Sequence, residues 1–196
     1  MRSQAGAKGL SMIVLPVGVA VVRCVDPTHH GAMATIAHMP GFVLPVPVDR
    51  WPPPEDGIRL DGLAFDPKTE LHVTLVGSAL GRELQAAFDG QAGATVRQLR
   101  DAMDWHFRRS GRQLLLRKRF VEHGRVVVAH SIIELVELPA MAPFHRALGC
   151  LLGRQLPLPP PHVTLFTAGH AQGIGVSSPA RLRALTVRTL SAHELD

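Results

Sequence analysis

The sequence predicts an α+β protein whose strands form antiparallel sheets. The expected strands and helices are joined by hairpins rather than by the regular strand–helix–strand alternation of a parallel sheet. The longest hairpin is expected at 113–138, with its turn at 122–124. The tetrapeptide His-Val-Thr-Leu occurs twice, at 72–75 and at 162–165. These features predict a distant internal duplication, in which each half carries a strand, a helix and one copy of the tetrapeptide.

Hydrophobic spacing and turn residues give the order of the elements. Three helices are expected to end at Gly90, Gly111 and Gly153. The first strand is expected at a sheet edge, because it contains Pro45 and Pro47. Apolar residues at helical spacing predict helices over 80–88, 96–107 and 140–152, with a short helix beginning near Pro179. Strands are expected at 41–48, 58–65, 71–76, 113–121, 125–138, 163–167 and 185–190.

The composition is that of a globular protein. The chain has 196 residues, of which 46% are hydrophobic and 19% charged, and it is long enough to bury a core without disulfides or metal. Cys24 and Cys150 lie far apart and form no CxxC pair, so we expect free thiols in a reducing compartment. The formal net charge of +5 favours an anionic partner without identifying it.

Residues 1–40 are expected to form an N-terminal extension, and residues 41–196 a single domain. Arg2 and Lys8 precede an apolar run at 10–22, a pattern that also fits a signal or membrane anchor. The run is short for a membrane span. The alternatives are a flexible extension, an extra strand or a start codon placed too early, and we expect a cytoplasmic protein that does not enter the membrane.

Each copy of the tetrapeptide falls on an expected strand. Because strand side chains alternate, His72 and Thr74 share one face, roughly 7 Å apart along the strand, and His162 and Thr164 do the same. Two such strands side by side would point two imidazoles and two hydroxyls at one phosphate. The hydroxyls would bind its oxygens, while a neutral histidine takes a proton and a protonated histidine gives one. In-line displacement at phosphorus of this kind needs no metal.

A structural role and a zinc site are the alternatives to this chemistry. A single His-x-Thr on a strand is usually structural, whereas two identical copies, each preceded by a turn, favour chemistry over accident. A zinc site on His72 and His162 would need an Asp, Glu, His or Cys partner at ligand spacing, and the sequence offers none. We therefore expect neither a metal nor a cofactor.

On the two tetrapeptides and the Gly-Ile-Gly-Val-Ser loop at 173–177, the sequence resembles the two-histidine phosphoesterase superfamily. That superfamily includes bacterial RNA 2′,3′-cyclic phosphodiesterases, also called 2′-5′ RNA ligases, and relatives acting on cyclic nucleotide or ADP-ribose phosphates. The resemblance covers residues 41–196. It implies a bilobal α+β fold, with two antiparallel sheets flanking a central cleft and helices on the outside. It also implies that His72 and His162 are the acid–base pair and that Thr74 and Thr164 bind phosphate.

The expected function is metal-independent hydrolysis, or reverse ligation, of a cyclic or 2′-linked phosphodiester by a monomeric protein. The expected partner is an RNA end, a small cyclic nucleotide or an ADP-ribose phosphate. The alternative is a non-catalytic protein that binds RNA ends or assists RNA repair.

Two further residues are candidates for substrate contact. Arg119, with Arg117 and Lys118, would contact phosphate or an RNA backbone, and the alternative is a solvated edge strand. Phe166, like Phe42 and Trp51, would stack a base, and the alternative is packing in the core.

Overall fold

A computed structural model describes residues 13–14, 20–21, 41–88 and 92–195. The chain divides into two units, Met1–Ala37 and His38–Asp196. In the first unit, β1 (Ile13–Val14) pairs with β2 (Ala20–Val21) in antiparallel fashion. The rest of the expected extension, including most of the apolar run at 10–22, lies outside the described residues. None of the helices described for the chain is long and apolar enough to cross a membrane.

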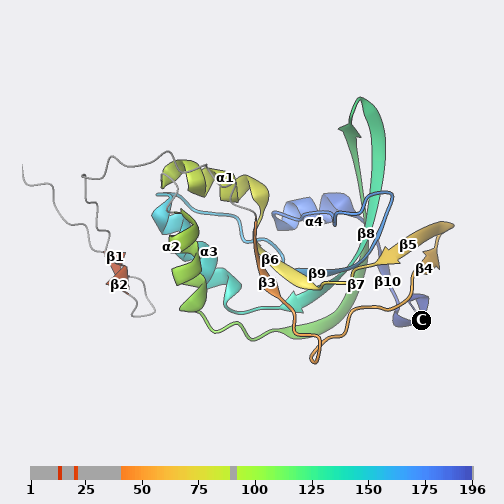
Figure 1. Cartoon of the computed structure of the whole chain (residues 1–196), viewed down its shortest axis with the longest axis horizontal. Helices are drawn as coiled ribbons and strands as arrows, with labels where there is room; N and C mark the ends of the chain where they lie inside the picture. Colours follow the sequence, from red (N-terminus) through yellow and green to blue (C-terminus); the bar gives the residue numbers. More distant parts are fainter. Residues whose placement is uncertain (1–12, 15–19, 22–40, 89–91, 196) are drawn as a thin grey trace, which may run out of the picture. The chain divides into compact units, whose positions relative to one another are not determined.

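The described strands of the second unit form one 8-stranded sheet in which each pairing is antiparallel (Figure 1). They are β3 (Phe42–Pro45), β4 (Ile58–Leu60), β5 (Leu63–Pro67), β6 (His72–Val76), β7 (Arg108–Glu122), β8 (Arg125–Glu137), β9 (His162–Ala168) and β10 (Thr186–Leu190). Neighbours follow the order β10-β7-β8-β9. The other edge of β9 pairs with both β6 and β5. β3 then pairs with β6, and β4 pairs with β5.

The α+β class and the antiparallel pairing are confirmed, but the expected division into two sheets flanking a cleft is not. The described strands belong to one sheet because β9 is shared: β8 occupies one of its edges, and β6 and β5 lie end to end along the other. The residues between β5 and β6 break what would otherwise be one long strand, although Lys68 N–H still donates to the Leu165 carbonyl at 2.8 Å. β9 is therefore an inner strand with neighbours on both sides.

Four α-helices are described in the second unit, together with a short 3-10 turn, η1 (Ala192–Glu194). They are α1 (Ser78–Ala87), α2 (Ala92–Asp101), α3 (Met141–Leu151) and α4 (Pro179–Leu185). α2 contacts both α1 and α3, whereas α4 lies against β7. Ser178 caps α4 by accepting a hydrogen bond from Arg181 N–H at 3.1 Å, and Pro179 opens its first turn.

The helix expected at 96–107 is wrong in its C-terminal part, because α2 ends at Asp101. Gly111 does not end a helix but lies inside β7, with φ at +68°. There the register with β8 shifts between Arg109 and Gln113. Glycine adopts positive φ at little cost, so Gly111 takes part in a strand irregularity rather than a helix end.

Two features expected from the sequence are confirmed. β7 and β8 form the long hairpin, and its turn places His123 at φ +49° and Gly124 at φ +76°. β3, which ends in Pro45, pairs with β6 alone, as expected for an edge strand that contains proline.

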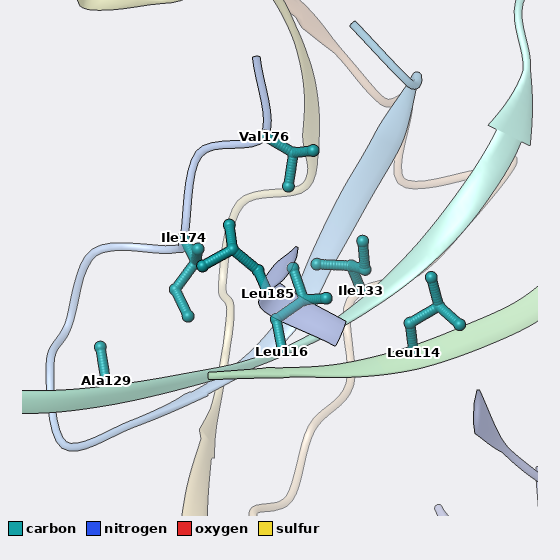
Figure 2. Packing of buried hydrophobic residues seen from close by; sticks show 7 residues of the cluster. All are labelled: Leu114, Leu116, Ala129, Ile133, Ile174, Val176 and Leu185. Atoms are coloured by element: carbon teal, nitrogen blue, oxygen red, sulfur yellow. The ribbon is translucent and has the colours of Figure 1, made fainter. Parts of the chain in front are cut away.

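A buried apolar cluster holds two segments, α4 and the loop that follows β9, against one face of the sheet. Figure 2 shows side chains of the loop and of α4 approaching those of β7 and β8. Ile133, a member of the cluster, is the cross-strand partner of Thr164, so the cluster lies on the face to which Thr164 points. The cluster comprises Leu114, Leu116, Ala129, Ile133, Ile174, Val176 and Leu185.

Candidate functional site

The two tetrapeptides lie side by side in the sheet. Val73 of β6 and Val163 of β9 are antiparallel cross-strand partners. An antiparallel pair has a local two-fold axis between its partners, so this axis relates one tetrapeptide to the other. Continuing the register by one residue in each direction brings His72 opposite Thr164 and Thr74 opposite His162.

All four polar side chains therefore point to the same face, which we call the motif face. Val73, Leu75 and Val163 alternate with them and are fully buried on the opposite face. The two histidines are diagonal neighbours across the strand pair, a relation that places Cα atoms roughly 7–8 Å apart and side chains within reach of one ligand. The structure thus brings together the four residues that the sequence singles out.

His162 is the more buried of the two histidines, with 9% of its surface exposed. Its Nδ1 lies 2.8 Å from the carbonyl oxygen of Pro160. Because a carbonyl only accepts, Nδ1 carries the hydrogen, and Nε2 is the atom left to take or give a proton. Pro157–Pro161 precede the strand, so a stiff segment delivers the carbonyl that orients the ring.

Burial lowers the pKa of both imidazoles below the ordinary value of 6.5. For His162, desolvation is the main cause, the Pro160 carbonyl opposes it, and the charge of His72 lowers the pKa further. For His72, desolvation comes first, the charge of Lys68 adds to it, and Glu70 opposes it. The effect of His72 on the pKa of His162 places the two rings within electrostatic range of each other. A proton on His72 therefore disfavours a proton on His162.

Thr164 is packed against the loop after β9. A Cβ atom added to Gly173 would lie 2.9 Å from Thr164 Oγ1 and 3.2 Å from Cγ2. The loop is anchored close by, because Ile174 N–H donates to the buried Ser131 Oγ at 3.0 Å and Ile174 joins the apolar cluster. Thr164 itself stays half-buried, so its hydroxyl can reach a ligand on the motif face.

His72 and Thr74 lie on the other strand of the pair, next to β3. Pro45 is the cross-strand partner of His72, and Val43 is the partner of Thr74. His72 also borders a hollow of about 210 Å³. The motif face is therefore bounded by the 173–176 loop on the Thr164 side and by the β3 edge on the His72 side.

The two lesser candidates lie apart from the four motif residues. Arg119 is exposed on β7, where its partner Val128 lies beyond the stretch of β8 that pairs with β9. It lines a separate hollow of about 560 Å³ together with Arg117, Lys118 and Arg181. Phe166 is 3% exposed and is the cross-strand partner of Ile132, which fits the alternative of packing in the core.

Several residues that support the site were not singled out from the sequence. Ser131 acts through its hydroxyl, which accepts the Ile174 N–H, and only the folded sheet reveals this contact. Glu134 is fully buried beside Val163 on the face opposite the motif residues. There its carboxylate accepts hydrogen bonds from Arg109 Nε at 3.0 Å and from Arg109 Nη2 at 2.7 Å. The sequence held two signals for this surrounding structure, the Gly-Ile-Gly-Val-Ser loop at 173–177 and the Pro-rich stretch before the second tetrapeptide. The Pro-rich stretch predicts a rigid approach but not its carbonyl contact.

Within the part of the chain that the structure describes, no group of three or more His, Cys, Asp or Glu side chains is placed to hold a metal ion. Cys150 is a free, exposed thiol, and Cys24 lies outside the described residues. Comparison with protein-family models, curated proteins and solved structures found no match to this chain.

Proposed function

We propose that the protein is a metal-independent phosphoesterase that opens a cyclic phosphodiester or cleaves a 2′-linked one. The observation that carries the proposal is the antiparallel pairing of Val73 with Val163, which puts two imidazoles and two hydroxyls on one face. This agrees with the resemblance to the two-histidine phosphoesterases. A purely structural role would not need two half-buried or buried imidazoles beside each other, since each pays a desolvation cost when charged.

In hydrolysis, a water oxygen attacks phosphorus while the bond from phosphorus to one ribose oxygen breaks. The neutral imidazole accepts the proton of the attacking water, and the protonated imidazole gives its proton to the departing ribose oxygen. Thr74 and Thr164 donate hydrogen bonds to the non-bridging oxygens, where charge accumulates. The product is a phosphomonoester, and the pair ends with its proton on the other ring. The local two-fold makes the two directions of reaction equivalent in form, so ligation would use the same groups with roles exchanged.

A substrate panel tests this proposal. The full chain is incubated with 2′,3′-cyclic nucleotides, RNA with a cyclic-phosphate end, a 2′-5′-linked dinucleotide and ADP-ribose 1″,2″-cyclic phosphate, with and without EDTA. We expect turnover of at least one substrate at a rate that EDTA does not change. Loss of turnover on chelation would contradict the mechanism, and absence of turnover on the whole panel would contradict the function.

The activity should depend on pH in a direction set by the two histidines. Both free-enzyme pKa values lie below 6.5, and the reaction needs one ring protonated and one neutral. As pH rises through those lowered pKa values the shared proton is lost, so kcat/KM should be greatest on the acid side of 6.5 and fall above it. A bound phosphate anion favours the protonated ring, so the maximum of kcat should lie at higher pH. A kcat/KM profile that keeps rising above pH 7 would be incompatible with this pair.

Gly173 should matter for turnover although it carries no functional group. In Gly173→Ala the new methyl group meets Thr164 Oγ1 at 2.9 Å, so the threonine or the loop must move. Moving Thr164, which is proposed to bind the substrate phosphate, by part of an ångström should lower kcat about tenfold or more. Gly175→Ala is the matched control, because its Cβ meets nothing within 4 Å. Equal kcat values for the two variants, measured beside circular dichroism melting curves, would show that this contact is unimportant.

The hollow lined by Arg119 favours a second candidate, a protein that binds RNA ends without turnover. Its four cationic side chains, Arg117, Lys118, Arg119 and Arg181, form no ion pair with a carboxylate in the described segments. Unpaired guanidinium groups suit a phosphate backbone. This candidate predicts RNA binding that weakens steeply with salt and releases no product, and turnover on the substrate panel would exclude it.

A further inference from the structure

We propose that the hollow beside His72 is a subsite for the uncharged ring of the substrate, such as the base of a cyclic nucleotide. It would disfavour a substrate that carries a second phosphate in this position. The inference rests on the proposed phosphoesterase function and narrows its substrate class.

The hollow opens beside the proposed phosphate position. Val43 and Pro45 line it, and their cross-strand partners are Thr74 and His72. Cross-strand partners point to the same face of a sheet, so both apolar side chains lie on the motif face. His72 itself forms part of the wall. A phosphodiester held by the four motif residues therefore has its organic substituent within reach of this hollow.

The lining suits a ring rather than a second anion. Seven of its residues are apolar: Val43, Pro45, Val46, Val48, Trp51, Pro53 and Leu71. Its volume of about 210 Å³ is below the roughly 300 Å³ at which pockets begin to hold drug-sized molecules, so it fits one ring system rather than a dinucleotide. Ligand pockets of this kind combine an apolar lining with a few polar groups that fix orientation.

The charged group at the hollow has the wrong sign for a phosphate. Glu70 and Thr69 complete the wall, and no Lys or Arg belongs to it among the described residues. A carboxylate repels a second phosphate and accepts hydrogen bonds from the amino group of a base. Lys68 lies near His72, but its ammonium donates to the Ala171 carbonyl, in the loop on the Thr164 side.

Trp51 supports the hollow from the side of the sheet on which Glu134 lies, opposite the motif face, and it is held there before any ligand arrives. Trp51 is 3% exposed, and the guanidinium carbon of Arg109 lies 4.1 Å from its ring centroid. The buried Glu134 fixes Arg109 in turn through two hydrogen bonds. A wall with fixed side chains loses little conformational freedom on binding, which favours selective recognition.

Two substrates and one pair of variants test the subsite. The first substrate is 2′,3′-cyclic CMP, and the second is methyl riboside 2,3-cyclic phosphate, which lacks the base. For the unchanged protein we expect KM for the nucleotide to be lower by about tenfold or more. Val48→Asp, at a side chain that lines the hollow and is 65% exposed, should remove this difference by raising KM for the nucleotide alone. Val126→Asp, at an exposed position near the hairpin turn, is the matched control and should keep it.

Equal KM values for the two substrates in the unchanged protein, or an equal rise for both in Val48→Asp, would overturn the subsite while leaving the phosphoesterase function intact. If neither substrate turns over, the function fails, and calorimetry decides the subsite separately. In that case cytidine 2′-monophosphate should bind at least tenfold more tightly than ribose 2-phosphate, and Val48→Asp should abolish the difference. Equal binding of the two monophosphates would then overturn the subsite as well.

Discussion

Replacing His162 with alanine should lower kcat on 2′,3′-cyclic nucleotides by about 10²–10⁴-fold, the usual contribution of one positioned acid or base. His72→Ala should cause a loss of the same order. The reason is that each ring handles one of the two protons that must move. Initial-rate measurements with a cyclic nucleotide check both variants.

The double variant separates a working pair from two independent groups. If the rings act together on one phosphorus, removing the second after the first should cost far less than the first did, because the remaining activity no longer uses acid–base catalysis. His106→Ala is the control, since that side chain is 70% exposed and lies outside the motif strands. Losses that multiply in the double variant, or full activity in either single variant, would contradict the proposed pair.

The second large effect is on stability. Arg109→Ala should lower the free energy of unfolding by about 3 kcal/mol, because it leaves the Glu134 carboxylate buried without its cation. Glu134 has no exposed surface, and its other donors are Gly111 N–H at 3.2 Å and Gln113 Nε2 at 3.3 Å. These two neutral donors remain in the variant, so the loss should lie near the lower end of the range for broken buried pairs. Urea unfolding followed by circular dichroism measures it.

The neighbouring ion pair provides the comparison. Arg108 and Glu137 approach to 2.6 Å, but their side chains are 83% and 57% exposed. Arg108→Ala should therefore cost less than about 1 kcal/mol. Replacing both members of the buried pair, as Arg109→Met with Glu134→Leu, should recover most of the stability, because no charge is then left uncompensated. Equal losses for Arg109→Ala and Arg108→Ala would show that the burial of Glu134 is not the cause.

Much of the site was predictable because it depends on the period of a strand. Alternation alone places His72 and Thr74 on one face of a strand, and it does the same for His162 and Thr164. Two identical tetrapeptides also imply two similar strands. That these strands lie next to each other was only a supposition, since strand order and register are set by contacts distant in sequence. The pairing of Val73 with Val163 supplies that missing relation.

The errors in the fold have physical causes of the same kind. Helical spacing continues through Val96, Leu99, Met103 and Phe107, yet α2 ends at Asp101 and β7 begins at Arg108, where the chain pairs with β8. Tertiary pairing thus overrides the local helical pattern. A two-sheet arrangement was expected from the resemblance, whereas β9 accepts neighbours along both edges. Buried partners such as Ser131 and Glu134 carry no local pattern that would distinguish them from other polar strand residues.

The shared inner strand also decides how the site can move. When two catalytic groups stand on separate lobes, a hinge can widen or narrow the gap between them during each turnover. Here the gap is spanned by hydrogen bonds between adjacent strands that lie about 4.8 Å apart, so it is as stiff as the sheet. For the proposed activity, substrate entry and product release would then use the rims, namely the loop that carries Gly173 and the edge formed by β3, while the two histidines stay still.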